Sequence, residues 1–292
     1  MCPEHKHYFD QRLLNMEPDL QRRIQRYGWD KAAPYYEEFW QDQLRPAQDL
    51  LMDMADLRPG ESVVDIACGT GLISLRALEK LGDRGKVLGT DISENMIQTA
   101  SAIVNRKNLH NIQFTRMDAE SLEIEDSKYD VALCALGLMY VPNPVKAIKE
   151  MFRVLRPGGR MVAAVWGQRD HCGWSEIFPI VDKRVTSEVC PMFFQMGNPG
   201  MLKLSLETAA FSTVEVKTIS TFLIYHSAEE ACGAAFAGGP VALAYHKFSE
   251  PVKKEAEAEY LASIRPYKKG EIYEVPGEFF VPPATTNSPG TS

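Results

Sequence analysis

The sequence lacks several features that mark particular classes of protein. Its six cysteines form no Cys-x-x-Cys pair, which argues against a zinc ribbon or a disulfide framework and predicts reduced thiols. The 32 basic residues are outnumbered by 39 acidic ones, and this net charge of −7 argues against a broad nucleic-acid-binding surface. The longest apolar run, residues 131–141, is about half the length that a bilayer-spanning helix needs. Residues 1–10 contain no apolar segment typical of a secretory signal. We therefore expect a cytoplasmic protein without a membrane span, a metal site or a nucleic-acid partner.

What the sequence does contain is the composition of an ordinary globular chain, with 292 residues, 45% of them hydrophobic and 24% charged. From residue 61 onward, short apolar or β-branched runs alternate with helical patterns. This alternation is typical of an α/β fold with a doubly wound, mainly parallel sheet covered on both faces. The predicted strands are Ser62–Ala67, Lys86–Asp91, Ile112–Arg116, Tyr129–Ala135 and Arg160–Trp166, and the predicted helices between them are Gly71–Leu81, Glu94–Arg106 and Val145–Leu155.

The flanking segments are less regular. Residues 8–58 have helical spacing, which we expect to be split into two or three pieces by Pro18, Gly28 and Pro34. Residues 168–198 carry aromatic side chains among prolines and glycines, as a pocket cover would. The predicted organisation is a helical N-terminal arm or lid (1–60), an α/β core (61–167), a first cap insertion (168–198), a helix and strand of the core (199–226), a second helical cap (227–268), a last strand (269–283) and a disordered tail (284–292).

A glycine-containing loop follows the first predicted strand. Gly69 and Gly71 would let the backbone approach a ligand, next to the free N–H groups of a helix N-terminus. A dinucleotide fingerprint needs a third glycine, where this sequence has Ser74, so a nicotinamide-dependent oxidoreductase is disfavoured. Asp65, just before the glycines, would repel a pyrophosphate but could orient an ammonium group. The loop therefore favours a cationic ligand.

Two more carboxylates follow successive strands. Asp91 ends the second strand, where a carboxylate can accept both hydroxyls of a ribose. Asp118 directly follows the third strand, within reach of the exocyclic amine of an adenine. Because the carboxyl ends of parallel strands share one edge of the sheet, the acidic residues together predict a site for adenine, ribose and a cationic amino-acid group.

These residues stand in motifs that resemble those of the class I S-adenosylmethionine-dependent methyltransferases. The motifs are D-I-A-C-G-T-G (65–71), G-T-D-I-S around Asp91, D-A-E (118–120), Y-D-V-A-L-C-A (129–135) and L-R-P-G-G-R (155–160). Within that class the chain looks most like the small-molecule branch related to the ubiquinone and menaquinone C-methyltransferases, and Y-G-W-D-K-A-A-P-Y-Y-E (27–37) is similar to the arm that covers the cofactor there. The resemblance implies a seven-stranded Rossmann-like methyltransferase fold. It also implies S-adenosylmethionine as cofactor, S-adenosylhomocysteine as product, and cofactor contacts from Tyr27, Asp65, Ala67, Gly69, Thr70, Gly71, Asp91, Ile92, Met96, Asp118, Ala119 and Ala135.

The predicted activity is in-line transfer of the methyl group to an oxygen, nitrogen or carbon atom of a small, apolar or aromatic acceptor. His171 is the candidate general base, because histidine titrates near neutral pH. Trp174, Phe178, Phe193 and His246 are the candidate acceptor-binding residues. A methyltransferase acting on a protein or an RNA, and a non-catalytic nucleoside-binding protein, stay open as alternatives. We expect a monomer or a homodimer.

Overall fold

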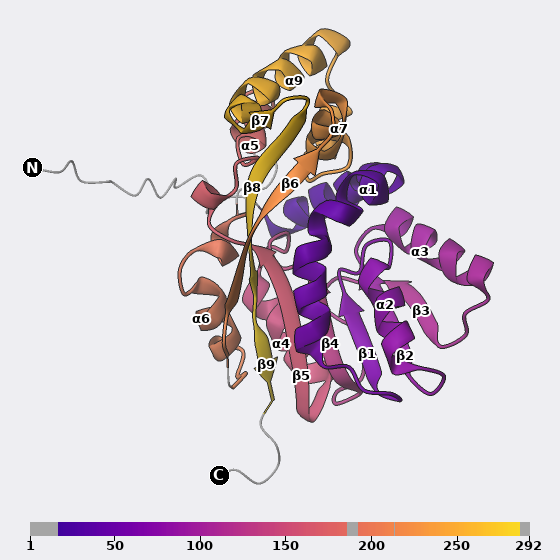
Figure 1. The fold of residues 1–292 in the computed structure, drawn as a ribbon. Helices are drawn as coiled ribbons and strands as arrows, with labels where there is room; N and C mark the ends of the chain where they lie inside the picture. The colour runs from indigo at the N-terminus through magenta and orange to yellow at the C-terminus, as the bar shows by residue number, and fades with distance from the viewer. Residues whose placement is uncertain (1–16, 186–191, 213, 287–292) are drawn as a thin grey trace, which may run out of the picture.

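The computed structural model describes residues 17–185, 192–212 and 214–286, which form an α/β fold around a central sheet (Figure 1). In these residues the sheet has the strand order β3-β2-β1-β4-β5-β8-β6, with β7 paired to β8 and β9 paired to β5. Strands β1 to β5 run parallel, whereas β8 is antiparallel to both β5 and β6. The strands are β1 (Ser62–Ile66), β2 (Lys86–Asp91), β3 (Ile112–Arg116), β4 (Tyr129–Ala135), β5 (Leu155–Trp166), β6 (Lys217–Tyr225), β7 (Lys268–Lys269), β8 (Ile272–Val281) and β9 (Pro283–Thr285).

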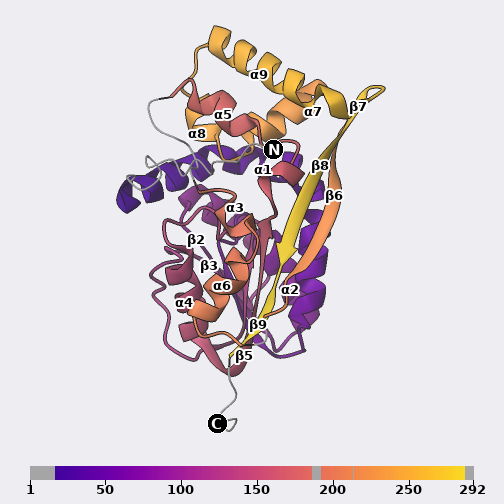
Figure 2. The same ribbon diagram turned by 90° about the vertical axis from the view of Figure 1, so that its left-hand side faces the viewer.

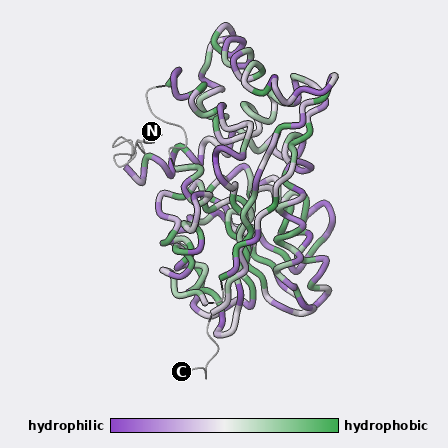
Figure 3. Tube along the Cα trace, turned by 60° about the vertical axis from the view of Figure 1, so that its left-hand side comes forward, coloured by the Kyte–Doolittle hydropathy of each residue, from purple (hydrophilic) through white to green (hydrophobic). Residues whose placement is uncertain are grey.

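The predicted mainly parallel α/β architecture is confirmed. The seven expected strands form the main path of the sheet, and the short strands β7 and β9 lie beside it. The main strand difference is β5, which begins at Leu155 rather than Arg160 and so includes the Arg-Pro-Gly-Gly segment. Four of the five residues of β1 and the four central residues of β4 are buried, as expected for strands covered by helices on both faces. Figure 3 shows hydrophobic residues concentrated along these central strands.

The helices of the core begin where capping residues place them. Ser93 caps α3 by accepting a hydrogen bond from the backbone N–H of Met96, and Asn143 caps α4 by accepting one from Lys146. The predicted second helical cap (227–268) is not one continuous helix, because a π-helical turn at Gly233–Ala237 and short irregular segments divide it. The helices are α1 (Pro18–Ala55), α2 (Leu72–Leu81), α3 (Glu94–Lys107), α4 (Pro144–Val154), α5 (Ile177–Asp182), α6 (Met201–Thr208), α7 (Ala228–Cys232), α8 (Ala242–Tyr245) and α9 (Glu250–Ile264).

Helix α1 corrects the expectation of a broken N-terminal arm, because it is one helix with Pro34 and Pro46 inside it. A proline at position 34 removes the hydrogen bond that the carbonyl of Asp30 would normally accept. The side-chain amide of Asn95, on α3, donates a hydrogen bond of 2.9 Å to that carbonyl instead. The helix is visibly bent, with its first half lying across the carboxyl end of the sheet and its second half running along the sheet (Figures 1 and 2).

The ends of the chain show one further difference. Residues 283–285 pair with β5 as strand β9, where we predicted a disordered tail from residue 284. The rest of that predicted tail, 287–292, and the first sixteen residues of the predicted arm lie outside the described residues. Within the described part of the chain, no helix has both the length and the apolar character needed to cross a membrane.

Candidate functional site

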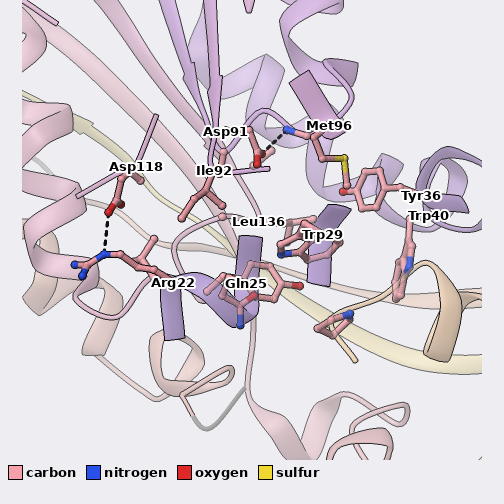
Figure 4. A pocket seen from close by; sticks show the side chains of 18 of the residues that line it. Arg22, Gln25, Trp29, Tyr36, Trp40, Asp91, Ile92, Met96, Asp118 and Leu136 are labelled. Carbon is pink, nitrogen blue, oxygen red and sulfur yellow. Dashed lines mark hydrogen bonds and ion pairs between the residues drawn. The ribbon is translucent and has the colours of Figure 1, made fainter. Parts of the chain in front are cut away.

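A cavity that opens to solvent lies at the carboxyl edge of the sheet, beneath the first half of α1, and together with its mouth it encloses about 950 Å³ of empty space (Figure 4). Its walls come from the loops that follow β1, β2, β3 and β4, from the end of β5, from α1 and from both caps. Seven of the lining residues at the strand ends were predicted from the sequence to bind the cofactor: Ala67, Gly69, Asp91, Ile92, Asp118, Ala119 and Ala135.

The loop after β1 is fixed by Asp91. One carboxylate oxygen of Asp91 accepts a hydrogen bond of 2.9 Å from the backbone N–H of Gly69, and the other accepts one of 2.9 Å from Ser93. A carboxylate has about four acceptor positions, so two stay available to a ligand. Gly69 faces the cavity, whereas a Cβ atom at Gly71 would lie 2.7 Å from the ring of Phe114. Gly71 therefore serves the packing of the loop on β3.

Asp65 is held in a second, smaller cavity that shares Tyr36, Ala67, Gly69 and Ala135 with the first. One oxygen of Asp65 accepts a hydrogen bond of 2.6 Å from the hydroxyl of Ser74, whereas the other is buried and has no partner among the described residues. Burial raises the pKa of Asp65 to about 7, and the nearby Asp91 carboxylate adds to the rise while Ser74 opposes it. A cationic group placed beside Asp65 would satisfy both the unpaired oxygen and the buried charge.

Asp91 has a raised pKa as well. Burial raises it to about 6, although hydrogen bonds from the backbone of Ser93 and Gly69 act in the opposite direction. The carboxylates of Asp65 and Asp91 face two adjoining cavities, and together they make the region where these cavities meet electronegative. Such a region favours a ligand that brings hydroxyl donors and a positive charge.

Asp118, after β3, also lines the large cavity and is already paired. Its carboxylate is 2.8 Å from the guanidinium of Arg22, on α1, and accepts a hydrogen bond from the backbone N–H of Glu120. The same guanidinium donates to the buried carboxylate of Glu120 at 2.6 Å. These contacts fasten the first half of α1 over the loop that follows β3 (Figure 4).

One face of α1 supplies a row of cavity residues that were not predicted individually, although two of them, Trp29 and Tyr36, lie in the segment 27–37 that resembles a cofactor-covering arm. The row changes from charged and polar at its start to aromatic and aliphatic at its end, so the cavity is polar over β3 and apolar over β5. The helical spacing of these residues is the signal that identifies the row, provided that the helix is known to continue through Pro34. The row consists of Arg22, Gln25, Trp29, Tyr36, Trp40 and Leu44.

Five other predicted site residues lie elsewhere. Tyr27 is 49% exposed on the outer side of α1, and the buried hydroxyl of Thr70 has no partner among the described residues. The Nδ1 atom of His171 lies 2.8 Å from the carboxylate of Glu278, and half of the His171 side chain is exposed. His246 is also exposed, and its Nδ1 atom lies 3.1 Å from the carbonyl of Ala242. None of these four residues, nor Gly71, lines the large cavity.

The predicted acceptor-binding aromatics separate into two layers. Trp174 lines the cavity. Phe178 and Phe193 are buried behind it, with ring centroids 5.9 and 5.5 Å from the Trp174 ring. Met96, predicted for the cofactor, lines the cavity with a side chain that is 2% exposed.

Comparison with known proteins gives a consistent result. Residues 57–183 match the family model described as "Methyltransferase domain". A demethylmenaquinone methyltransferase of Listeria welshimeri is 33% identical over 127 residues, which are 44% of this chain and 54% of that protein. The chain thus spans about half the length of the curated relatives that it matches.

Solved structures share the fold across a larger part of the chain. The 4+2 cyclase SpnF has a TM-score of 0.60 at 18% identity, covering 92% of this chain and 96% of its own. A phosphoethanolamine N-methyltransferase of Haemonchus contortus, bound to phosphomonomethylethanolamine and S-adenosylhomocysteine, has a TM-score of 0.59 at 18% identity, covering 89% of this chain and 58% of its own. Residues 57–183 therefore match a methyltransferase domain, and the chain shares a Rossmann-like α/β fold with solved structures of methyltransferases.

Proposed function

We propose that this protein transfers the methyl group of S-adenosylmethionine to a small, uncharged, apolar or aromatic acceptor and releases S-adenosylhomocysteine. The observation that carries the proposal is the graded cavity, which has carboxylates over β1, β2 and β3 and indole side chains over β5. A nucleoside with a cationic amino-acid group matches the first part, and an apolar acceptor matches the second.

The cofactor would match the carboxylates in the order in which the strands present them. Asp118 would lie beside the adenine, Asp91 would accept the ribose hydroxyls, and the unpaired oxygen of Asp65 would accept a hydrogen bond from the ammonium group. Tyr36 lines both cavities, so its ring would lie beside the junction between the nucleoside and the amino-acid tail. Burial raises the pKa of its hydroxyl, and the Asp91 and Asp65 carboxylates raise it further, so this hydroxyl stays protonated.

The protein residues would act mainly by alignment. Bound S-adenosylmethionine supplies a methyl group that is already activated by the positive sulfur. The first half of α1, fastened by Arg22 to Asp118 and Glu120, would exclude water and hold the two ligands together. Such positioning can provide about 7–11 kcal/mol of the barrier reduction.

The acceptor class is supported by the apolar end of the cavity. Trp40, Leu44, Trp166, Trp174 and Pro240 line that end. The demethylmenaquinone methyltransferases among the relatives have a name that denotes an aromatic acceptor of this general kind. That name supports a small-molecule acceptor over a protein or an RNA.

Calorimetry with the purified protein tests the proposal. We expect S-adenosylmethionine and S-adenosylhomocysteine to bind, and Asp91→Ala to weaken both at least about 10-fold through loss of charged hydrogen bonds. Asp83→Ala, at the exposed turn after α2, is the matched control and should bind normally. Incubation with S-adenosylmethionine and a pool of aromatic acceptors should then release S-adenosylhomocysteine. Because a cyclase shares this fold, binding without that release would favour a function other than methyl transfer.

A further inference from the structure

The smaller cavity, which Asp65 lines, also receives a polar side chain from α1. Gln48 lines this cavity and is 6% exposed. It follows Tyr36, Trp40 and Leu44 at four-residue spacing, and residues four apart on a helix are neighbours on one face. The row of cavity residues along α1 thus extends from the large cavity into the smaller one.

Gln48 is an exception on the buried side of the second half of α1. Its side chain makes no hydrogen bond with any described residue, although buried amides normally have a partner. No amide atom of Gln48 belongs to the enclosed, unpartnered polar atoms found among the described residues, so the amide is open to the cavity that it lines. A position that packs with apolar neighbours would be better filled by an apolar side chain unless a polar ligand binds beside it. These buried neighbours along the helix are Leu44, Ala47, Leu51, Met52 and Ala55.

The N-terminus of α2 supplies further donors to the same cavity. Leu72 and Ile73 begin this helix of 10 residues, and both line the cavity. Their backbone N–H groups lie in the first turn, where the helix has no carbonyl to pair them, and no described residue accepts a hydrogen bond from them. A helix N-terminus favours a negatively charged group. Together with the amide of Gln48, it therefore offers donors to an anion.

The smaller cavity thus combines a carboxylate with donors for an anion. A simple anion would be repelled by Asp65, and a simple cation would leave the donors without a partner. A group that carries an ammonium and a carboxylate on one carbon atom would satisfy both. The smaller cavity shares 4 lining residues with the large one, so a single ligand can occupy both.

We infer that Gln48 and the N-terminus of α2 bind the carboxylate of the cofactor's amino-acid group, with the amide of Gln48 donating a hydrogen bond to it. This contact selects a cofactor whose amino-acid group is complete. The inference rests on the proposed function, and it goes further by naming a binding residue in the second half of α1, outside the motifs at the strand ends.

The test compares S-adenosylhomocysteine with its decarboxylated analogue, S-adenosyl-3-thiopropylamine, which keeps the ammonium group and lacks the carboxylate. In calorimetry the wild-type protein should bind S-adenosylhomocysteine about 10- to 100-fold more tightly, as hydrogen bonds to a charged group provide. Gln48→Leu should weaken S-adenosylhomocysteine about 10-fold and leave the affinity for the analogue unchanged. Gln41→Leu, the same change at an exposed position of α1, should alter neither affinity.

A second variant tests the sign of the contact. Gln48→Glu keeps the shape of the side chain and adds a negative charge, which should repel the carboxylate of S-adenosylhomocysteine and attract the ammonium group of the analogue. The preference for S-adenosylhomocysteine should therefore fall below that of Gln48→Leu. Without ligand, Gln48→Leu should unfold at a temperature no lower than the wild type, because it removes an unpaired buried amide.

Equal affinities of the two ligands in the wild type would overturn the inference. It would also be overturned if Gln48→Leu weakened both ligands equally or neither, because the amide would then contact the ammonium group or no part of the cofactor. A lower unfolding temperature of ligand-free Gln48→Leu would likewise contradict it, since the amide would then support the fold. Absence of S-adenosylhomocysteine binding in the wild type would instead overturn the proposed function.

Discussion

Replacing Asp65 by Asn should raise the stability of the ligand-free protein at pH 8 while weakening cofactor binding. Burial raises the pKa of Asp65 in the folded state to about 7, against 3.8 for an aspartate in water. A rise of this size makes the ionised side chain cost the fold about 4 kcal/mol. The contribution of Asp65 to stability is fully present below about pH 4 and is lost as the pH rises through about 7.

The Asn side chain removes this charge and keeps an oxygen for the hydroxyl of Ser74. It also places an N–H group where the unpaired oxygen of Asp65 stands, at a cost of about 1–3 kcal/mol. The net gain at pH 8 is therefore about 1–3 kcal/mol. The cost of the amide is the same at every pH, so it cancels between two pH values. The effect of the substitution should thus be more favourable at pH 8 than at pH 5 by about 3 kcal/mol.

Urea denaturation of wild type and Asp65→Asn at both pH values measures this difference, and calorimetry measures binding of S-adenosylmethionine. We expect affinity to fall at least about 10-fold, because the ammonium group loses a charged partner. Asp83→Asn, an exposed acid with an identical chemical change, should alter neither quantity. If the effect of Asp65→Asn on the free energy of unfolding is the same at pH 5 and pH 8, ionisation of Asp65 does not destabilise the folded state. If cofactor affinity is unchanged, Asp65 does not bind the ammonium group.

Three other substitutions test separate parts of the structure. Arg22→Ala removes the ion pairs of α1 to Asp118 and Glu120, so cofactor dissociation should be several-fold faster in stopped-flow measurements, and an unchanged rate would contradict a role for α1 as a cover. Asn95→Ala removes the side-chain donor to the carbonyl of Asp30 and should lower the free energy of unfolding by about 0.5–1.5 kcal/mol in urea denaturation, whereas no loss would mean that the bend at Pro34 needs no support. Gly71→Ala should lower the free energy of unfolding more than Gly82→Ala. Both glycines have a positive φ, but only at Gly71 would the added Cβ meet the ring of Phe114. Equal losses would contradict the role of Gly71 in packing the loop against Phe114.

The sequence identified the strand ends well because local patterns determine them. Strands β2, β3 and β4 have the predicted bounds, and parallel strands necessarily bring Asp65, Asp91 and their neighbours to one edge. These features depend on residues that are close together in the sequence, so no tertiary information is needed to find them.

The row on α1 could not be predicted in the same way, because it depends on a distant contact. A proline normally ends or kinks a helix, and continuation through Pro34 is supported by Asn95, 65 residues from Asp30 in the sequence. Likewise, the sequence predicted the same acceptor-binding role for Trp174 and Phe178, because both are aromatic residues of the first cap. Only packing decides that the first lines the cavity and the second lies behind it. His171 is bonded to Glu278, a residue 107 positions away that local sequence does not connect to it.

The continuity of α1 has a consequence for sequence variation along it. Its first turns and its middle contact different sides of the sheet, with Arg22 over β3 and Trp40 beside the end of β5. Each residue of an α-helix turns the chain by about 100° and advances it by about 1.5 Å. One residue inserted between Gln25 and Tyr36 would therefore rotate Arg22 away from Asp118 while Trp40 stayed in the core. Substitutions on the outer face of α1 should thus be tolerated, whereas any change in the number of residues between these two positions should disrupt the site.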